Sequence, residues 1–245
     1  VLGPAALGIY TLAYRLPELL LIGVVSVLNR AVFPALAEVQ DRTAELRKGF
    51  LATMRYVPMV VVPIGLGLIV AAEPIVLVTL GDAWAEAVPV LRVLAAYALI
   101  STLMVADGDV YKATGRSRLL AGFAGLKLTL LVPSLLVAVH HGLVAVAIAH
   151  LATTIAVKAL RVVYAARIVE VRITDLLAPL LPTLMAGAAL VAAALGAMAA
   201  TAAAGDLTRL LATAAAGAAA YLIVLGRLER RSITRLVSLL RSRNP

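Results

Sequence analysis

Seven apolar stretches, each long enough to cross a lipid bilayer, dominate this sequence. A membrane-spanning helix needs about 20 predominantly apolar residues. With 63% hydrophobic and 14% charged residues, the 245-residue chain has far more apolar surface than a water-soluble domain of this size can bury. We therefore predict an all-α integral membrane protein with about seven transmembrane helices. The predicted spans are at about 8–35, 52–80, 87–111, 118–140, 142–166, 178–201 and 206–226.

Basic residues divide the connecting segments into two sets. The alternate connectors 81–86, 141–142 and 202–209 hold only Arg209. Because Lys and Arg are retained on the cytoplasmic side of a membrane, this asymmetry predicts residue 1 outside and the C-terminus in the cytoplasm. It also explains the net charge of +9 better than nucleic-acid binding does. The other connectors and the tail hold Arg42, Arg47, Lys48, Arg55, Lys112, Arg116, Arg118, Arg167, Arg172, Arg227, Arg230, Arg231, Arg235, Arg241 and Arg243.

The chain divides into a seven-span region, 1–226, and a basic amphipathic cytoplasmic tail, 227–245. Residues 36–50 and 228–243 mix apolar and charged residues at helical spacing, so we predict that they lie on the membrane surface. The chain begins at Val1 without a signal peptide, although its start is predicted to lie outside. We therefore expect further spans upstream in a longer polypeptide.

Several prolines fall inside the predicted spans. Pro17 in the first span and Pro58 and Pro63 in the second are expected to bend these helices. Neighbouring helices in a membrane bundle can satisfy the freed backbone groups, so such bends are tolerated. The spans at 178–201 and 206–226 are rich in Ala and Gly, and we expect them at the periphery of the bundle.

The first span carries a polar stripe. Its polar side chains fall close to one line along a helix drawn at roughly 100° per residue. Because an ionisable side chain at membrane depth normally faces a cavity or a partner, we interpret the stripe as the lining of a water-filled cavity. The alternative is that Arg15 and Glu18, three positions apart, simply pair with each other. The stripe consists of Thr11, Arg15, Glu18, Ser26, Asn29 and Phe33.

Charged residues of the later spans give weaker signals. Lys127 lies too deep in the fourth span for its side chain to reach water easily. The sequence leaves two roles for it: binding a ligand or pairing with a carboxylate. Arg92 lies in the third span, and the fifth contains His150. Near the cytoplasmic boundary of the third span, Asp107 and Asp109 have pairing with a nearby Lys or Arg as the alternative to a functional role. The nearby basic residues are Lys112 and Arg116. Lys112, Lys158 and Arg161 lie near the cytoplasmic boundary, and we expect their long side chains to extend toward the membrane surface.

Patterns typical of an enzyme are missing from the sequence. There is no nucleophile with a His partner, no His/Cys metal spacing and no Gly-rich phosphate loop. The triplet Asp107-Gly108-Asp109 is similar to the DxD of metal-dependent glycosyltransferases, but it stands alone at the end of a span. We predict a protein that is not an enzyme, with no catalytic residue, metal or cofactor.

Two motifs stand out in residues 2–41, LGxYxLAYR and SVLNRxxFPAL. Together with LGDAWAEAVPVLRVLA (80–95), KATGR (112–116) and HGLVAVAIAH (141–150), they resemble the C-terminal lobe of polysaccharide exporters of the multidrug/oligosaccharidyl-lipid/polysaccharide superfamily (Wzx-type transporters). Members have about fourteen spans in two pseudo-symmetric lobes that form an inverted V. The resemblance implies that the seven spans form one lobe, whose partner is the missing N-terminal lobe of the same protein.

The same resemblance implies a flippase in the cytoplasmic membrane of the cell. Its substrate would be an undecaprenyl-pyrophosphate-linked oligosaccharide, moved across the bilayer by alternating access for the biosynthesis of cell-surface polysaccharide, such as lipopolysaccharide. On this interpretation, the pyrophosphate is bound by Arg15, Lys127 and Arg92. Cavity-lining residues would be Thr11, Glu18, Ser26 and Asn29, and the carboxylates that carry a coupling proton or sodium ion would be Glu18, Asp107 or Asp109.

Other activities are left open by the sequence. A peptidoglycan-precursor flippase or a drug/cation antiporter of the same superfamily would have the same architecture. A cation antiporter should have an acidic cavity, whereas the deep charges here are balanced or basic. A membrane-embedded glycan polymerase or ligase should have a large outer loop, whereas the outer connectors here are short.

Overall fold

The computed structural model describes residues 3–39, 42–103 and 106–230, and every regular element within these ranges is a helix. Seven helical segments of the described chain are long and apolar enough to cross a membrane. Each overlaps one of the stretches predicted from the sequence, so the predicted all-helical fold with seven spans is confirmed. The segments are Ala6–Leu28, Thr43–Val70, Ala87–Ala113, Ser117–His141, Leu143–Ile168, Ile173–Ala200 and Asp206–Leu228.

Three of the spans are composite and four are single helices. The first consists of α1 (Gly3–Pro17), a π-helical turn η1 (Glu18–Ile22) and α2 (Gly23–Ala37). The second consists of α3 (Thr43–Val70) and α4 (Ala72–Leu80), and the third of α5 (Ala87–Leu103) and α6 (Ala106–Ala113). The others are α7 (Ser117–Ala138), α8 (Leu143–Ile168), α9 (Ile173–Ala200) and α10 (Asp206–Leu228), with short 3₁₀ turns η2 (Asp82–Trp84) and η3 (Val139–His141) in two connectors.

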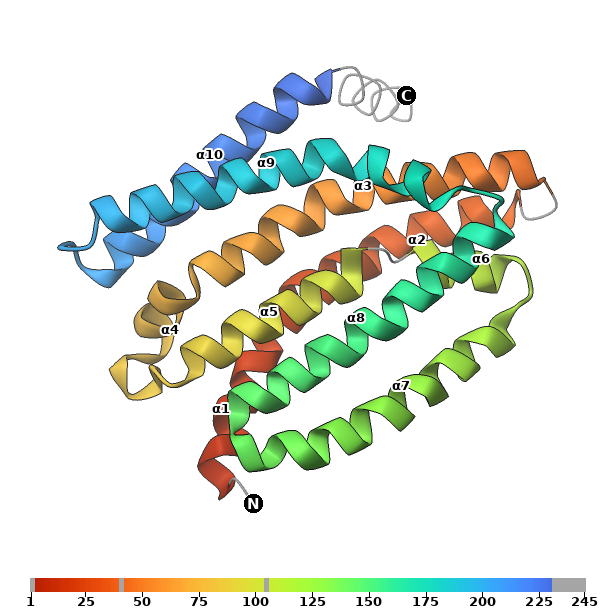
Figure 1. Ribbon diagram of the computed structural model, residues 1–245. Coiled ribbons are helices and arrows are strands. Elements are labelled where there is room, and N and C mark those ends of the chain that lie inside the picture. The colour runs from red at the N-terminus through yellow and green to blue at the C-terminus, as the bar shows by residue number, and fades with distance from the viewer. Residues whose placement is uncertain (1–2, 40–41, 104–105, 231–245) are drawn as a thin grey trace.

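Six helices lie side by side in the order α10, α9, α3, α5, α8 and α7 (Figure 1). The first span crosses one face of this row, with α1 packed on α5 and α2 packed on α3 and α6. The helices α7 and α10 form its two edges. The expected peripheral position is therefore found for α10, whereas α9 packs closely against α3.

A missing side chain allows the close contact between α9 and α3. A Cβ added at Gly187 in α9 would lie 2.8 Å from Cδ1 of Leu66 and 3.2 Å from Cγ1 of Val62, both in α3. Small residues at such positions let helix backbones approach closely in a membrane. The Gly content that made this span look featureless in the sequence therefore places it next to the core.

Proline affects the first two spans differently. In the first, the α-helix changes to the π-helical turn η1 directly after Pro17. In the second, α3 remains α-helical through Pro58 and Pro63 and ends at Val70. Pro74 then lies in the first turn of α4, where its missing N–H is not needed. The helix of the second span is therefore interrupted at Ala71 and not at the two prolines that were expected to bend it.

The predicted surface helix at 36–50 is wrong. The helix α2 ends at Ala37, and α3 begins at Thr43 and continues into the membrane span. Leu46 and Phe50 are buried in the core, whereas their charged neighbours are exposed, because this part of α3 is the polar end of a span. The second predicted surface helix, 228–243, lies outside the described residues except for its first three positions.

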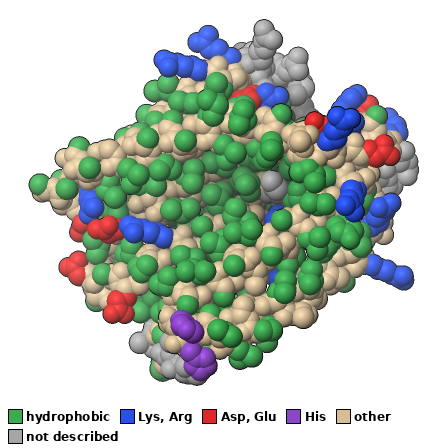
Figure 2. All heavy atoms as spheres, in the orientation of Figure 1, with side chains coloured by type: hydrophobic (Ala, Val, Ile, Leu, Met, Phe, Trp, Pro, Cys, Tyr) green, Lys and Arg blue, Asp and Glu red, His purple; other side chains and the backbone are tan. Residues whose placement is uncertain are grey.

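The molecular surface has an apolar belt between two polar ends. Figure 2 shows hydrophobic side chains over most of the visible face, with charged side chains near its edges. We call the end formed by the connectors around 38–42, 114–116 and 169–172 the basic end, and the end formed by 81–86, 139–142 and 201–205 the opposite end. Exposed Leu128, Leu136 and Leu222 belong to the belt, as expected for surface in contact with lipid.

Candidate functional site

The polar stripe of the first span lies on the exposed side of its helix. Thr11 and Arg15 are exposed, whereas Ala13 and Pro17, on the packed side of α1, are buried. Glu18 is half-buried at the start of η1. Beyond the π-helical turn, exposed Ser26 donates a hydrogen bond to the carbonyl of Gly23, and the side chains of Asn29 and Phe33 lie outside what the structure describes. Within the described residues, Thr11, Arg15 and Ser26 of the stripe are thus exposed.

Arg15 has no carboxylate partner among the described residues. Although Glu18 follows three positions later, the two side chains form no ion pair, so the alternative in which they neutralise each other is not found. Arg15 instead borders a hollow of about 250 Å³ between α1, α4 and α5. The apolar lining of this hollow includes Leu12, Leu16, Leu19, Ile75 and Leu91. A guanidinium therefore lies beside an apolar surface.

Lys127 is half-buried in the middle of α7. Its Nζ lies 5.4 Å from the centroid of the Tyr97 ring in α5, which is a cation–π contact. Within the described residues, Lys127 has no ion pair with a carboxylate. A cation–π contact offsets only part of the free energy of removing an ammonium from water, so a bound anion would be stabilised here.

Tyr97 belongs to a cluster of four aromatic rings between α1, α5 and α8. The ring of His150 lies 4.3 Å from that of Tyr97, and the Tyr14 ring lies 5.9 Å from Tyr97 and 6.2 Å from His150. The hydroxyl of Tyr10 and Nδ1 of His150 are 3.3 Å apart, within hydrogen-bond distance. The sequence interpretation missed this cluster, although Tyr10 and Tyr14 are spaced by one helical turn and so share a face of α1.

Arg92 lies in a different environment, near the opposite end of the bundle. Its guanidinium forms an ion pair with Glu73 at 3.6 Å. Arg209 of α10 lies 3.1 Å from the other carboxylate oxygen of Glu73. The carboxylate thus links α4, α5 and α10. The structure does not bring Arg92 into contact with Arg15 or Lys127.

Asp107 is fully buried in α6 and contacts two cations of α8. Nζ of Lys158 lies 3.0 Å from one carboxylate oxygen, and Nε of Arg161 lies 2.7 Å from the other. The expected partners for Asp107 were Lys112, in the same helix, and Arg116, in the turn that follows it, so the structure corrects the partner. It also corrects the expectation for Lys158 and Arg161, which point to Asp107 and not toward the membrane surface.

Asp109 does have one of the expected partners, but at long range. Nζ of Lys112 lies 3.9 Å from its Oδ1, and Oδ2 is buried without a hydrogen-bond partner. Within the described chain, no three His, Cys, Asp or Glu side chains are grouped closely enough to hold a metal ion. The carboxylates of α6 therefore balance basic side chains.

Charge pairing separates the deep cations into two groups. Arg92, Lys158 and Arg161 each have a carboxylate partner. Away from the ends of the spans, Arg15, Arg30 and Lys127 have no carboxylate partner in the described chain. Arg15 and Lys127 lie inside the apolar segments Ala6–Leu28 and Ser117–His141, whereas Arg30 lies beyond the first of these. Such charges at membrane depth are stabilised by water in a cavity or by an anionic ligand. These two residues are consequently the strongest candidates for binding an anion.

Comparison with known protein families connects the first part of the chain with polysaccharide biosynthesis. The model of a family described as polysaccharide biosynthesis protein matches residues 1–89, which include the first span, the second span and Trp84. The matched range thus includes α1 to α4, η2 and the first residues of α5, and it contains Arg15.

Similar proteins come from three bacteria. The teichuronic acid biosynthesis protein TuaB of Bacillus subtilis (strain 168) is 32% identical over 118 residues, which are 48% of this chain and 24% of TuaB. The lipopolysaccharide biosynthesis protein WzxC of Escherichia coli (strain K12) is 28% identical over 137 residues, 56% of this chain and 28% of WzxC. An uncharacterized membrane protein in the cps region of Klebsiella pneumoniae is 26% identical over 152 residues, 62% of this chain and 31% of that protein.

The matched stretches thus cover less than a third of the length of these relatives. No solved structure matches the chain.

Proposed function

The chain is a multi-pass membrane protein related to the polysaccharide biosynthesis family, and from this relationship we propose that it forms one lobe of a flippase for lipid-linked oligosaccharide. The substrate would be an oligosaccharide on undecaprenyl pyrophosphate, moved from the cytoplasmic to the outer leaflet by alternating access. The second lobe would come from the same polypeptide. Under this proposal the basic end of the bundle and the C-terminus face the cytoplasm.

The observation that carries this proposal is the uncompensated charge of Arg15 on the exposed side of α1. A pyrophosphate cannot cross hydrocarbon without partners, because burying its charge costs far more free energy than a folded protein can supply. An arginine can donate two parallel hydrogen bonds to phosphate oxygens. Lys127, the other unpaired deep cation, would add a second positive charge. Arg92 is the weakest of the three candidates because Glu73 already neutralises it.

The same reasoning orders the carboxylates proposed to carry a coupling ion. Asp107 is held by two cations, and a proton or sodium ion would have to compete with both. Glu18 has no ion pair in the described chain and lies one turn from Arg15. We therefore propose Glu18 as the coupling residue, with Asp109 behind it. The excess of unpaired cations over unpaired carboxylates also argues against a cation antiporter.

Replacement of Arg15 tests the proposal. In the full-length protein, Arg15→Ala should abolish export of cell-surface polysaccharide and leave a folded, inserted protein, because the exposed side chain contributes little to packing. Arg15→Lys should restore export only in part, since an ammonium lacks the two-pronged geometry of the guanidinium. The matched control is Arg227→Ala, which removes an exposed arginine at the end of α10 and should not change export.

A double variant separates binding from simple neutralisation. Arg15→Leu combined with Glu18→Leu removes both charges and should remain inactive if Arg15 binds the substrate. Normal export by a well-expressed double variant would exclude this role of Arg15. Surface polysaccharide and the lipid-linked precursor retained inside the cell are the two quantities to measure.

A further inference from the structure

Trp84 is the only tryptophan of the chain, and it lies at the opposite end of the bundle. It ends the 3₁₀ turn η2, in which its backbone N–H donates to the carbonyl of Gly81 at 3.1 Å. Gly81 has a φ of 82°, a left-handed value that favours glycine. The indole is half-buried and packs against a buried cluster that includes Ala13 of α1, Val76 of α4 and Leu91 of α5. The turn and this cluster fix the position of the ring.

Trp84 also borders an open hollow of about 620 Å³ beside α1. Among the residues of α1 that line it, four exposed ones follow one another at intervals of three or four positions, so they share one face of the helix. These are Pro4, Gly8, Thr11 and Arg15. A Cβ added at Gly8 meets no atom within 4 Å, so the space beside this face is open.

Hydrogen-bond donors of three side chains border the hollow. The guanidinium of Arg15, the hydroxyl of Thr11 and the indole N–H of Trp84 have no hydrogen-bond partner among the described residues. A sugar ring has an apolar C–H face and hydroxyl groups around its edge. An aromatic side chain flanked by donors matches both parts of such a ring.

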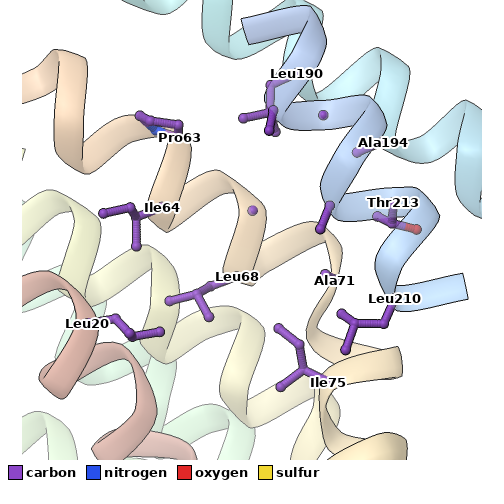
Figure 3. Close-up of a pocket in the computed structure, with 14 residues that line it drawn as sticks. Leu20, Pro63, Ile64, Leu68, Ala71, Ile75, Leu190, Ala194, Leu210 and Thr213 are labelled. Atoms are coloured by element: carbon purple, nitrogen blue, oxygen red, sulfur yellow. The ribbon is translucent and has the colours of Figure 1, made fainter. Parts of the chain in front are cut away.

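The hollow between α9, α10, α3 and α4 lacks this combination (Figure 3). It measures about 270 Å³, and its lining includes Leu68, Leu190 and Leu210. None of the described residues around it is charged or aromatic, and Thr213 supplies the polar side chain. The chemistry that suits a sugar is therefore found beside Trp84.

We propose that Trp84 and Thr11 bind the sugar that is attached directly to the pyrophosphate held by Arg15. The inference rests on the proposed function and adds a sugar subsite to it. Along α1, the face from Thr11 to Pro4 runs from Arg15 toward the opposite end of the bundle. A glycan whose pyrophosphate is paired with Arg15 thus has its first ring beside Trp84 and extends outward from there.

A lipid contact is the competing role for Trp84. Tryptophan is enriched where membrane helices meet the lipid headgroups, where it anchors the helix end. An anchor of this kind needs neither the hydroxyl of Thr11 nor the open space at Gly8. Variants of these two residues consequently distinguish a sugar site from a lipid contact.

Three variants remove one property of the site each. Trp84→Leu removes the aromatic face, Thr11→Val removes the hydroxyl at nearly constant shape, and Gly8→Leu fills the hollow with a side chain. The matched controls are Tyr164→Leu, which removes an exposed ring at the basic end, and Gly122→Leu on the exposed side of α7. An added Cβ at Gly122 also meets nothing within 4 Å.

Binding of two ligands to the full-length protein in lipid nanodiscs tests the proposal. The ligands are the lipid-linked oligosaccharide isolated from cells in which export is blocked, and undecaprenyl pyrophosphate without a sugar. The wild type should bind the first about tenfold more tightly, because stacking and hydrogen bonds to the sugar are added. Trp84→Leu and Gly8→Leu should abolish this preference and keep the affinity for undecaprenyl pyrophosphate. Thr11→Val should reduce the preference, and both controls should retain it.

The outcomes separate the sugar subsite from the proposed function. Equal affinity of the wild type for the two ligands, or an unchanged preference in Trp84→Leu, would exclude the subsite while the flippase proposal stands. If the wild type binds neither ligand, the proposed function itself fails. In a second measurement, a benzophenone amino acid at Leu7, which also lines the hollow, should crosslink to the oligosaccharide under light. Capture of phospholipid alone, with the lipid-linked oligosaccharide present, would overturn the assignment.

Discussion

Asp107 in α6 accepts a hydrogen bond from Lys158 in α8 at 3.0 Å, and its side chain is 0% exposed. Arg161 lies beside its other oxygen, so one carboxylate serves two cations. The hydroxyl of Tyr111 also donates to the carbonyl of Arg161 at 2.5 Å. The short helix α6 is thus fastened to α8 by both side chains and backbone.

We expect Asp107→Asn to destabilise the protein strongly. The change leaves Lys158 and Arg161 close together with their buried anion removed, and breaking a buried ion pair in this way costs roughly 3–5 kcal/mol. Thermal denaturation in detergent, followed by size-exclusion chromatography, measures the effect. Lys158→Met should cost less, because Arg161 still neutralises Asp107. The control Asp175→Asn breaks an exposed pair with Arg47 and should shift the transition little.

Arg55→Met is expected to loosen the end of α10. It leaves the carboxylate of Glu229, 1% exposed, without its bidentate partner. The free energy of unfolding should fall by roughly 2–4 kcal/mol. This is less than for a fully buried ion pair, because Arg55 is itself partly exposed. Limited proteolysis near residue 228 and the denaturation temperature are the two readouts. Arg227→Met, which removes an exposed arginine nearby, should match the wild type; equal loss in both variants would contradict a specific role for Arg55.

Gly142 is predicted to be required for the turn between α7 and α8. Its φ of 94° and ψ of 178° belong to a region that only glycine adopts readily. An added Cβ meets no atom within 4 Å, so the cost of Gly142→Ala comes from the backbone alone, about 1–3 kcal/mol. Gly205→Ala is the control: its φ of −64° suits alanine, and it should be neutral or slightly stabilising. Equal melting temperatures would argue against backbone strain.

Cysteine labelling tests the proposed orientation in the membrane. The chain contains no Cys, so single replacements can be introduced without background. Cysteine at Ala83 or Ala204, both exposed at the opposite end, should react with an impermeant thiol reagent added to intact cells. Cysteine at Glu45 or Ser117 should react only after the cells are opened. Labelling at Ser117 in intact cells would reverse the orientation.

The sequence predicted the spans because hydrophobic length is a local property. All seven spans were located, since a run of about 20 apolar residues has few other stable arrangements, although the second was predicted at 52–80 and is found at Thr43–Val70. The segment 43–50 was misassigned because an amphipathic pattern is the same for a helix on the surface and for the polar end of a span. Only the continuous backbone of α3 through Gly49 distinguishes the two.

Partners of charged residues could not be predicted in the same way. Lys112 and Arg116 were proposed for Asp107 because they are near in sequence, yet its partners lie 51 and 54 positions away. Which face of α8 meets α6 depends on packing across the whole bundle, and one sequence contains no direct signal of it. That Arg15 has no carboxylate partner in the described chain likewise becomes evident only from the positions of the carboxylates in the structure.

The π-helical turn at Glu18–Ile22 gives the first span one surplus residue. A turn of this kind takes up an extra residue without adding a full helical turn, so α2 is rotated about the axis relative to a continuous α-helix. The turn is thus a position at which the span accommodates the insertion of a single residue. Deleting one residue between Pro17 and Gly23 would return the span to a regular helix, a change that elsewhere in a packed helix would turn every following side chain to a new direction. In relatives whose first span is a regular helix, an alignment should accordingly show a one-residue gap at this point.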